Sequence, residues 1–292
     1  MKLSAWLLFF TSFFNFTPAG YSQSVFPARG FSSILEPAEA EEKINLFRNY
    51  FFRDQRNQVF HQGYLYQFEF THYPRADQPV THLGLLSGPF PESTTIRIDL
   101  ISRKEDAIPY YSFLLKRDSV NPILWKWNKK KELLSKVSPE DWFSPWVEGI
   151  NHSPFDLLMP FLNWPNQYEK SGRVCGRPAH LYTFTPLPNS TFSQSSLSSI
   201  RLAIDDAYNA PLRIEHMDGG ILPSRTFSLQ SFKKVEDRWV VKTIDVKDRD
   251  SKSKTRFELV SVAHKLDLPG TSFDKSGLKN PINQSSIDFQ NL

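Results

Sequence analysis

Residues 199–266 contain five consecutive segments in which apolar and polar side chains alternate. Alternation with period two is typical of β-strands that bury one face. Turn-forming residues separate the segments, and Asp218-Gly219-Gly220 is the clearest turn because glycine accepts the positive φ of tight turns. This stretch therefore predicts an antiparallel meander with an apolar inner face. The predicted strands are 200–204, 211–216, 225–235, 239–248 and 255–266, and the candidate inner-face residues are Ile200, Leu202, Ile204, Leu212 and Ile214.

One clear strand pattern and several weaker ones lie upstream of this meander. Residues 64–70 place four aromatic rings on one face and Leu65, Gln67 and Glu69 on the other. Sequential strands at short spacing favour one curled antiparallel sheet over a parallel one. We expect about eleven strands, in a sheet whose concave face its own side chains cannot fill. The remaining predicted strands are 82–86, 94–102, 110–117, 123–127 and 173–185.

Two helical regions interrupt the strand pattern. Residues 36–55 carry Ile44 and Phe47 at helical spacing and acidic residues near the N-terminal end, which predicts an amphipathic helix. Ser138-Pro139 and Ser153-Pro154 are typical helix starts within an apolar insertion at about 138–164. We expect this insertion to cover the concave face as a lid; ordinary core packing is the alternative. The candidate cavity and lid residues are Trp142, Phe143, Trp146, Phe155, Leu158, Phe161, Leu162, Tyr66, Phe68, Ile98, Leu202 and Ile214.

The N-terminal residues are typical of a secretory signal. Lys2 precedes an apolar run from Leu3 to Phe16, which is shorter than the roughly 20 residues of a transmembrane helix. Cys175 is the only cysteine, so no intrachain disulfide can form and no cysteine stands at the cleavage point for lipid attachment. We expect an exported, soluble monomer without a lipid anchor. The predicted boundaries are 1–24 for the signal peptide, 25–276 for a single domain and 277–292 for a loose polar tail.

The sequence contains no common catalytic or phosphate-binding motif, and we expect no catalytic site, metal site or cofactor. The formal net charge of +4 does not indicate a nucleic-acid partner. His61, His72 and His82 are spaced so that a metal site on neighbouring strands is conceivable, but ordinary surface or core histidines are favoured. Cys175 is interpreted as a small buried residue rather than a nucleophile.

Three charged stretches have a structural and a functional interpretation. The Asp205-Asp206 pair is better explained as a hairpin turn than as a catalytic carboxylate pair. Asp245, Asp248 and Asp250 lack the glycine and distal glutamate of a calcium loop, which favours a solvated hairpin end. Residues 125–131 interleave tryptophan with lysine, so they suit either contact with an anionic membrane surface or a partner, or a strand end followed by a solvated turn, and the turn is favoured.

Several strands and turns share a family pattern. They are Asp156-Leu157-Leu158-Met159-Pro160 with its continuation to Pro165, Cys175-Gly176-Arg177-Pro178-Ala179-His180-Leu181-Tyr182, and the segments 200–205, 210–215, 232–241 and 266–273. Over about 157–273 the chain resembles the outer-membrane lipoprotein-sorting proteins (LolA/LolB-like carriers). The resemblance implies a mainly β fold, an unclosed and strongly curled antiparallel β-barrel whose helices cover an apolar cavity for acyl chains. The arginine that helps some carriers hold or release cargo has no matching motif here.

This resemblance implies a periplasmic, non-enzymatic carrier that binds acyl chains of lipoproteins or related lipids for outer-membrane sorting. Transient contact with a membrane or an outer-membrane receptor would accompany that role. The alternative is a periplasmic lipid- or stress-sensing regulatory module of the same fold, and an enzyme such as a lipid hydrolase is a third possibility.

Overall fold

A computed structural model describes residues 33–52, 63–89, 95–101, 109–116, 123–188, 196–235 and 238–292. The predicted signal peptide, at 1–24, lies outside these residues. No helix within the described ranges is long and apolar enough to cross a membrane.

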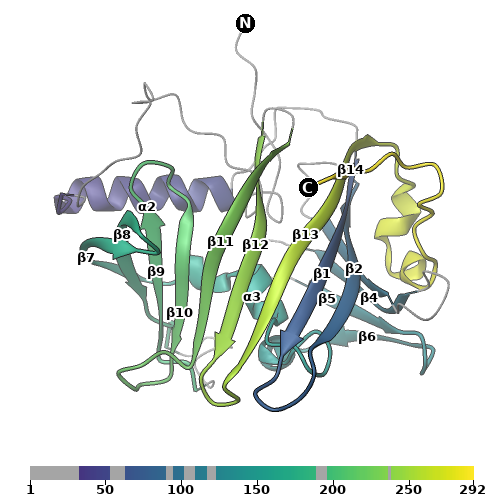
Figure 1. Ribbon diagram of the computed structural model, residues 1–292, viewed down its shortest axis with the longest axis horizontal. Helices are drawn as coiled ribbons and strands as arrows, with labels where there is room; N and C mark the ends of the chain where they lie inside the picture. The colour runs from purple at the N-terminus through teal and green to yellow at the C-terminus, as the bar shows by residue number, and fades with distance from the viewer. Residues whose placement is uncertain are drawn as a thin grey trace, which may run out of the picture.

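The described residues form one antiparallel sheet of fourteen strands (Figure 1). Its order is β6-β5-β4-β3-β2-β1-β13-β12-β11-β10-β9-β8-β7, and the short β14 pairs with β13. The strands are β1 Gly63–Tyr73, β2 Val80–Gly88, β3 Thr95–Ile101, β4 Pro109–Lys116, β5 Ile123–Asn128, β6 Leu133–Val137, β7 Asn166–Val174, β8 Arg177–Phe184, β9 Ser199–Asp205, β10 Pro211–Met217, β11 Arg225–Val235, β12 Arg238–Asp248, β13 Ser253–Leu266 and β14 Gln290–Asn291.

The predicted meander is confirmed as β9 to β13, and the mainly β, unclosed antiparallel sheet is confirmed as the fold class. The structure has three strands more than the sequence predicts. The predicted strand 173–185 corresponds to β8 and the end of β7, because Cys175 and Gly176 both adopt positive φ and turn the chain, and most of β7 lies upstream of the predicted bounds. The others are β6 and β14, which are short and carry little alternation.

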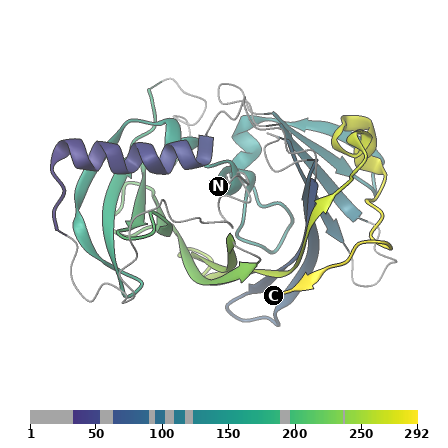
Figure 2. The ribbon, with the colours of Figure 1, turned by 90° about the horizontal axis from the view of Figure 1, so that it is seen from above.

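The strand order explains why the insertion lies where it does. β6 and β7 follow each other in sequence but form opposite edges of the sheet. The chain between Val137 and Asn166 must therefore cross from one edge to the other. Figure 2 shows the sheet curving around this crossing, with α3 in its hollow. The crossing contains η1 Pro139–Phe143, α3 Pro154–Leu158 and η2 Pro160–Asn163, so both predicted helix starts are confirmed.

Helix α2, Pro37–Phe52, confirms the predicted N-terminal helix. It lies across one half of the molecule, beside β7 to β9 (Figures 1 and 2). Ala40, Ile44 and Phe47 are buried in the main core, and the Tyr182 hydroxyl donates a hydrogen bond to the Ala40 carbonyl at 2.9 Å. The helix thereby buries its apolar face against the sheet.

The C-terminal segment covers the other, convex face of the β1–β5 half. It contains η3 Gly270–Phe273 and η4 Lys275–Lys279, and Phe273 and Leu278 pack against Leu114. Ile282 joins a second small core with Leu65. The predicted loose tail from Gly277 is therefore wrong, because scattered apolar residues in a polar sequence still find partners on the convex face.

One predicted inner-face residue lies on the other face. Ile200, Leu202, Ile204 and Ile214 belong to the concave core as predicted, whereas Leu212 packs on the convex side with Val174, Ala179 and Ala203. A register irregularity between Pro211 and Arg213 shifts the alternation of β10 at this point. A one-residue shift moves a side chain to the opposite face of a strand.

Candidate functional site

The concave face and the insertion form a single apolar cluster. Eleven of the twelve predicted cavity and lid residues belong to it, ten of them buried and Phe143 partly buried. The side chain of the twelfth, Leu158, lies outside the described residues. The sequence prediction that these distant residues meet is confirmed by the structure; their role as a lipid-binding surface stays a prediction.

Aromatic rings of the insertion pack directly on the strands. Trp146 lies edge-on to Phe113 of β4, with ring centroids 4.8 Å apart. Phe161 contacts Phe184 of β8 at 5.4 Å. Within the insertion Phe143 stacks on Phe155 at 4.4 Å. The insertion therefore occupies the concave face that the strands cannot fill, and its two ends contact both halves of the sheet.

A polar cluster lies under the start of α3. The Ser153 amide donates to Asp156 Oδ2 at 2.7 Å, which forms the capping box of this helix. Asp156 Oδ2 is also 3.4 Å from Arg225 Nη1 of β11, and Asp156 Oδ1 is 3.6 Å from His216 Nε2 of β10. The Asp156 side chain is only 5% exposed. One buried carboxylate thus joins the insertion to two strands of the meander.

This cluster contains buried polar atoms whose hydrogen bonds are not made. Within the described ranges, Asp156 Oδ1 and both ring nitrogens of His152 have no hydrogen-bond partner. Leaving a buried donor or acceptor unsatisfied costs about 1–3 kcal/mol. His152 packs instead between the rings of Phe70 and Phe227, at centroid distances of 4.7 and 6.1 Å. The packing of the insertion on the sheet therefore includes an energetic penalty.

Burial shifts the protonation of the same groups. It raises the pKa of Asp156 to about 6, against the opposing effect of Arg225. Burial, reinforced by the positive charge of Arg225, lowers the pKa of His152 and that of His216 to about 3. At neutral pH both histidines are therefore uncharged, and Asp156 is ionised beside the Arg225 guanidinium.

A second anchor of the insertion is fully hydrogen-bonded. The backbone amide of Asn151 donates a hydrogen bond to Thr255 Oγ1 at 2.9 Å, and the side-chain Nδ2 of Asn151 donates one to Ser253 Oγ at 3.1 Å. Ser253 and Thr255 begin β13. The insertion is thus held at one point by matched hydrogen bonds and at the neighbouring point by the cluster around Asp156, in which some buried polar atoms have no partner among the described residues.

The structure also decides the other sequence interpretations. Cys175 is exposed in the β7–β8 turn, so its interpretation as a buried residue is wrong. His72 contacts Thr255 Oγ1 and His82 contacts the Tyr110 hydroxyl, at 2.8 and 2.7 Å. His61 lies outside the described residues, and the described part of the chain holds no group of metal-ligating side chains.

Asp205, Asp206, Asp248 and Asp250 lie in or next to hairpin turns, as predicted, whereas Asp245 is only 7% exposed within β12, so its interpretation as part of a solvated hairpin end is wrong. Asp205 Oδ1 accepts the amides of Ala207 and Tyr208 in the β9–β10 turn. Asp206 contacts His180 Nε2 at 2.7 Å. Asp245 makes two hydrogen bonds with Arg256, whereas Asp248 and Asp250 bond within the β12–β13 hairpin.

The segment 125–131 is also a strand end followed by a turn. Trp125 and Trp127 pack with the C-terminal segment, and Lys275 lies 4.2 Å from the Trp125 ring centroid. Lys126 lies 4.3 Å from the ring centroid of Tyr111. These contacts occupy the rings that would otherwise meet a membrane.

Sequence reasoning missed two features of the site. The cluster of His152, Asp156, His216 and Arg225 joins residues up to 73 positions apart, and Asp156 was the one that the sequence associated with a helix start and with the family pattern. A pocket of about 280 Å³ lies between α2 and β7, lined by Leu35, Pro37, Ala40, Glu41, Asn166, Tyr168 and Tyr182. The amphipathic α2 was the one available signal for it.

Comparisons with known proteins add the family context. A family model described as "Uncharacterized protein" matches residues 164–280, and a comparison with curated proteins finds no match. A solved structure described as an outer membrane lipoprotein-sorting protein domain from Vibrio parahaemolyticus has a TM-score of 0.64 at 15% identity, covering 83% of this chain and 97% of its own. A LolA superfamily protein from Nitrosomonas europaea has a TM-score of 0.57 at 11% identity, covering 81% and 98%. The fold is LolA-like.

A third structure supports the same assignment. A DUF1329 family protein from Desulfovibrio piger has a TM-score of 0.65 at 12% identity, covering 84% of this chain and all of its own. The resemblance predicted from the sequence is therefore confirmed at the level of the fold. Within this LolA-like fold, the insertion and the concave face of the sheet form the candidate functional site.

Proposed function

We propose that this protein is a periplasmic, non-enzymatic carrier that shelters acyl chains of lipoproteins or related lipids between the curled sheet and the insertion. The observation that carries the proposal is the construction of the insertion. It presents aromatic and aliphatic side chains to the concave face, yet it is docked there over buried polar atoms without partners. Such a segment can be displaced by an apolar ligand more easily than a uniformly apolar core.

The energetics are consistent with exchange between lid and cargo. Burial of an acyl chain is worth about 0.8 kcal/mol per methylene, so roughly 14 methylenes supply about 11 kcal/mol. Displacing Trp146, Phe155 and Phe161 from the sheet offsets much of this gain. The unsatisfied groups at His152 and Asp156 reduce the cost of opening by about 1–3 kcal/mol each. Binding is thereby strong enough to hold a chain and weak enough to release it.

The proposed function requires that the protein is exported to the periplasm. Residues 1–24 act as a signal peptide that is removed, and the mature chain works in the periplasm without a lipid anchor. Mass spectrometry of the protein recovered from the periplasm should give an N-terminus close to Val25. A protein that keeps Met1 would contradict this part of the proposal.

A reversible lock on the insertion tests the carrier function. Asn151 of the insertion and Ser253 of β13 hydrogen-bond through their side chains. We therefore expect N151C/S253C to form a disulfide, in a background where the exposed Cys175 is replaced by serine. The oxidised form should take up a fluorescent fatty acid at least about tenfold more weakly than the same protein after reduction.

The reduced protein is the matched control, since both states share one sequence. Gently purified wild type should also carry lipid detectable by native mass spectrometry. Absence of lipid, together with equal fatty-acid binding in the locked and reduced states, would contradict the proposal. Capture of a protein partner by the locked form would then favour a regulatory module.

A further inference from the structure

One end of the sheet carries an exposed apolar loop. The β10–β11 loop, residues 218–224, presents Ile221 and Leu222, which are 92% and 65% exposed. Tyr73 and Val80 flank the β1–β2 hairpin and are also exposed. Figure 1 places the β10–β11, β12–β13 and β1–β2 connections along the same rim. Large apolar side chains gathered on one rim indicate an interaction surface.

The loop is held rigidly while its apolar side chains stay in solvent. The Gly219 amide donates to Ser198 Oγ at 2.8 Å, and the Ser224 amide donates to the His216 carbonyl at 2.8 Å. Arg249 donates to the Leu222 carbonyl and to Asp218 Oδ2 at 2.9 and 2.6 Å. Both ends and the middle of the loop are therefore fixed, so the exposure of Ile221 is built into the fold.

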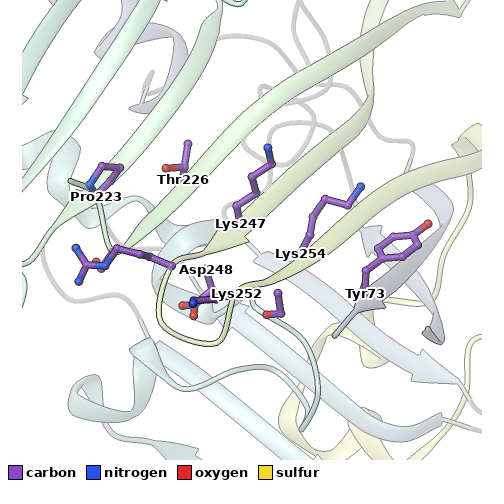
Figure 3. Close-up of a pocket in the computed structure, with 10 residues that line it drawn as sticks. Tyr73, Pro223, Thr226, Lys247, Asp248, Lys252 and Lys254 are labelled. Atoms are coloured by element: carbon purple, nitrogen blue, oxygen red, sulfur yellow. The ribbon is translucent and has the colours of Figure 1, made fainter. Parts of the chain in front are cut away.

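Cationic side chains lie beside the loop. Lys247 and Lys254 are directly paired across β12 and β13, and Tyr73 is paired with Lys254 from β1. Their neighbours Val246 and Phe257 face the concave core, so this row faces the convex side. Figure 3 shows the Lys247, Lys254 and Tyr73 side chains extending the same way around an open pocket of about 410 Å³.

The charges of this rim are not evenly neutralised. Arg249 pairs with Asp218 and Asp250, and Lys254 lies 3.8 Å from Asp245 and 4.6 Å from the Tyr73 ring centroid. Lys247 and Lys252 are exposed and form no ion pair within the described residues. Lys247 acts on Asp245 electrostatically without forming an ion pair, so both lysines keep their ammonium groups in solvent. They line the same pocket as Tyr73 and Pro223, the residue that follows the aliphatic pair.

We propose that this rim docks on the surface of a bilayer containing anionic phospholipids. Ile221 and Leu222 enter the boundary between head groups and acyl chains, while Lys247 and Lys252 face the phosphates. Tyr73, with an apolar ring and a polar hydroxyl, suits the same interface. A soluble anion would account for the lysines alone, whereas a bilayer accounts for the lysines and the aliphatic pair together.

Vesicle flotation tests the surface without any reference to cargo. The exported protein is mixed with vesicles of phosphatidylethanolamine, with or without phosphatidylglycerol, at low and high salt. We expect binding to the anionic vesicles, loss of about tenfold or more in I221D/L222D, and a smaller, salt-sensitive loss in K247E/K252E.

Matched variants place the same changes elsewhere. L133D removes an exposed leucine of β6, and K130E/K131E makes the same charge change in the β5–β6 turn. Both should bind like wild type, and far-ultraviolet circular dichroism should show that all variants fold. Equal binding by wild type and both rim variants would overturn the proposal. So would a wild type that does not float but forms a dimer that I221D/L222D abolishes.

The result is separable from the carrier function. Fatty-acid uptake by the rim variants should equal that of wild type, because the rim side chains face away from the concave core. Loss of flotation with normal uptake supports the docking surface. Loss of both properties together in the folded rim variants would contradict it, since the rim would then be part of the cavity.

Discussion

Two segments dock on opposite faces of the same sheet, and each buries charged groups beneath it. On the convex side, Arg97 is fully buried and uses its guanidinium for Asp99 and for the carbonyls of Ser272, Gly277 and Asn280. On the concave side, Asp156 and His152 retain buried polar atoms without hydrogen-bond partners among the described residues.

The difference lies in the ionisable side chains. On the convex face the buried atoms without a partner among the described residues are the hydroxyls of Ser87 and Ser112, beside a fully hydrogen-bonded Arg97, whereas on the concave face they include atoms of an aspartate and a histidine. Satisfied buried charges are costly to break, because removing one partner leaves the other buried and unpaired. Buried polar atoms without a hydrogen-bond partner, such as the ring nitrogens of the uncharged His152, already carry a cost in the docked state. We therefore infer that the C-terminal segment is a fixed part of the fold, whereas the insertion is the element that moves.

The largest expected effect is on the convex side. R97M should lower the free energy of unfolding by about 3–5 kcal/mol, because Asp99 then stays buried without its ion-pair partner. Chemical denaturation measures this loss. R97M/D99L should recover most of it by replacing both charges with apolar groups. A loss below about 1 kcal/mol in R97M would show that the convex attachment does not depend on this network.

The second-largest expected effect is a difference in how the two segments respond to acidification. The lowered pKa of His152 and of His216, each about 3, means that their uncharged forms stabilise the docked insertion above pH 6.5 and that this stability is lost as the pH falls toward 3. Asp156, with its pKa raised to about 6, acts oppositely: its ionised form disfavours docking above that pH, and protonation relieves this penalty as the pH falls from 6 toward 3.8.

Two histidines outweigh one aspartate, so docking should weaken by about 2 kcal/mol between pH 7 and pH 5. Hydrogen exchange, corrected for the intrinsic pH dependence, should accelerate about tenfold or more in the insertion and much less in residues 270–280. Equal acceleration in both segments would indicate global unfolding rather than release of the insertion.

The sequence predicts the sheet better than the polar contacts that distinguish its two faces. Alternation places Tyr66, Phe68 and Ile98 on the concave side because each strand carries its own pattern. Arg97 lies between Ile96 and Ile98 and has the pattern of a solvent-facing residue, yet the C-terminal segment about 180 positions later buries it. Such burial depends on packing by a distant segment, which the alternation of side chains within one strand cannot indicate.

The same limit applies to the candidate site. Ser153-Pro154 and Asp156 predict the start of α3 because a capping box is local. His216 and Arg225 belong to other strands, and the β10–β11 pairing places them directly opposite each other beneath that helix. Leu212 is another residue whose position depends on strand pairing, since one irregular pairing step in β10 moves its side chain to the opposite face of the sheet.

The smallest effect concerns two neighbouring residues of the insertion. His152 has unsatisfied ring nitrogens, whereas the amide of Asn151 donates to Ser253 and accepts from it. H152L should raise the free energy of unfolding by about 1 kcal/mol. Leucine has a volume similar to that of histidine, and it replaces two buried ring nitrogens that form no hydrogen bond in the folded protein. N151A should lower the free energy of unfolding by about 1 kcal/mol.

H152L should also slow hydrogen exchange in the insertion and weaken fatty-acid uptake, since a better-docked lid competes more strongly with cargo. Destabilisation of H152L to the extent of N151A would mean that His152 holds the insertion in place, and the contrast between the two faces would then rest on Asp156 alone.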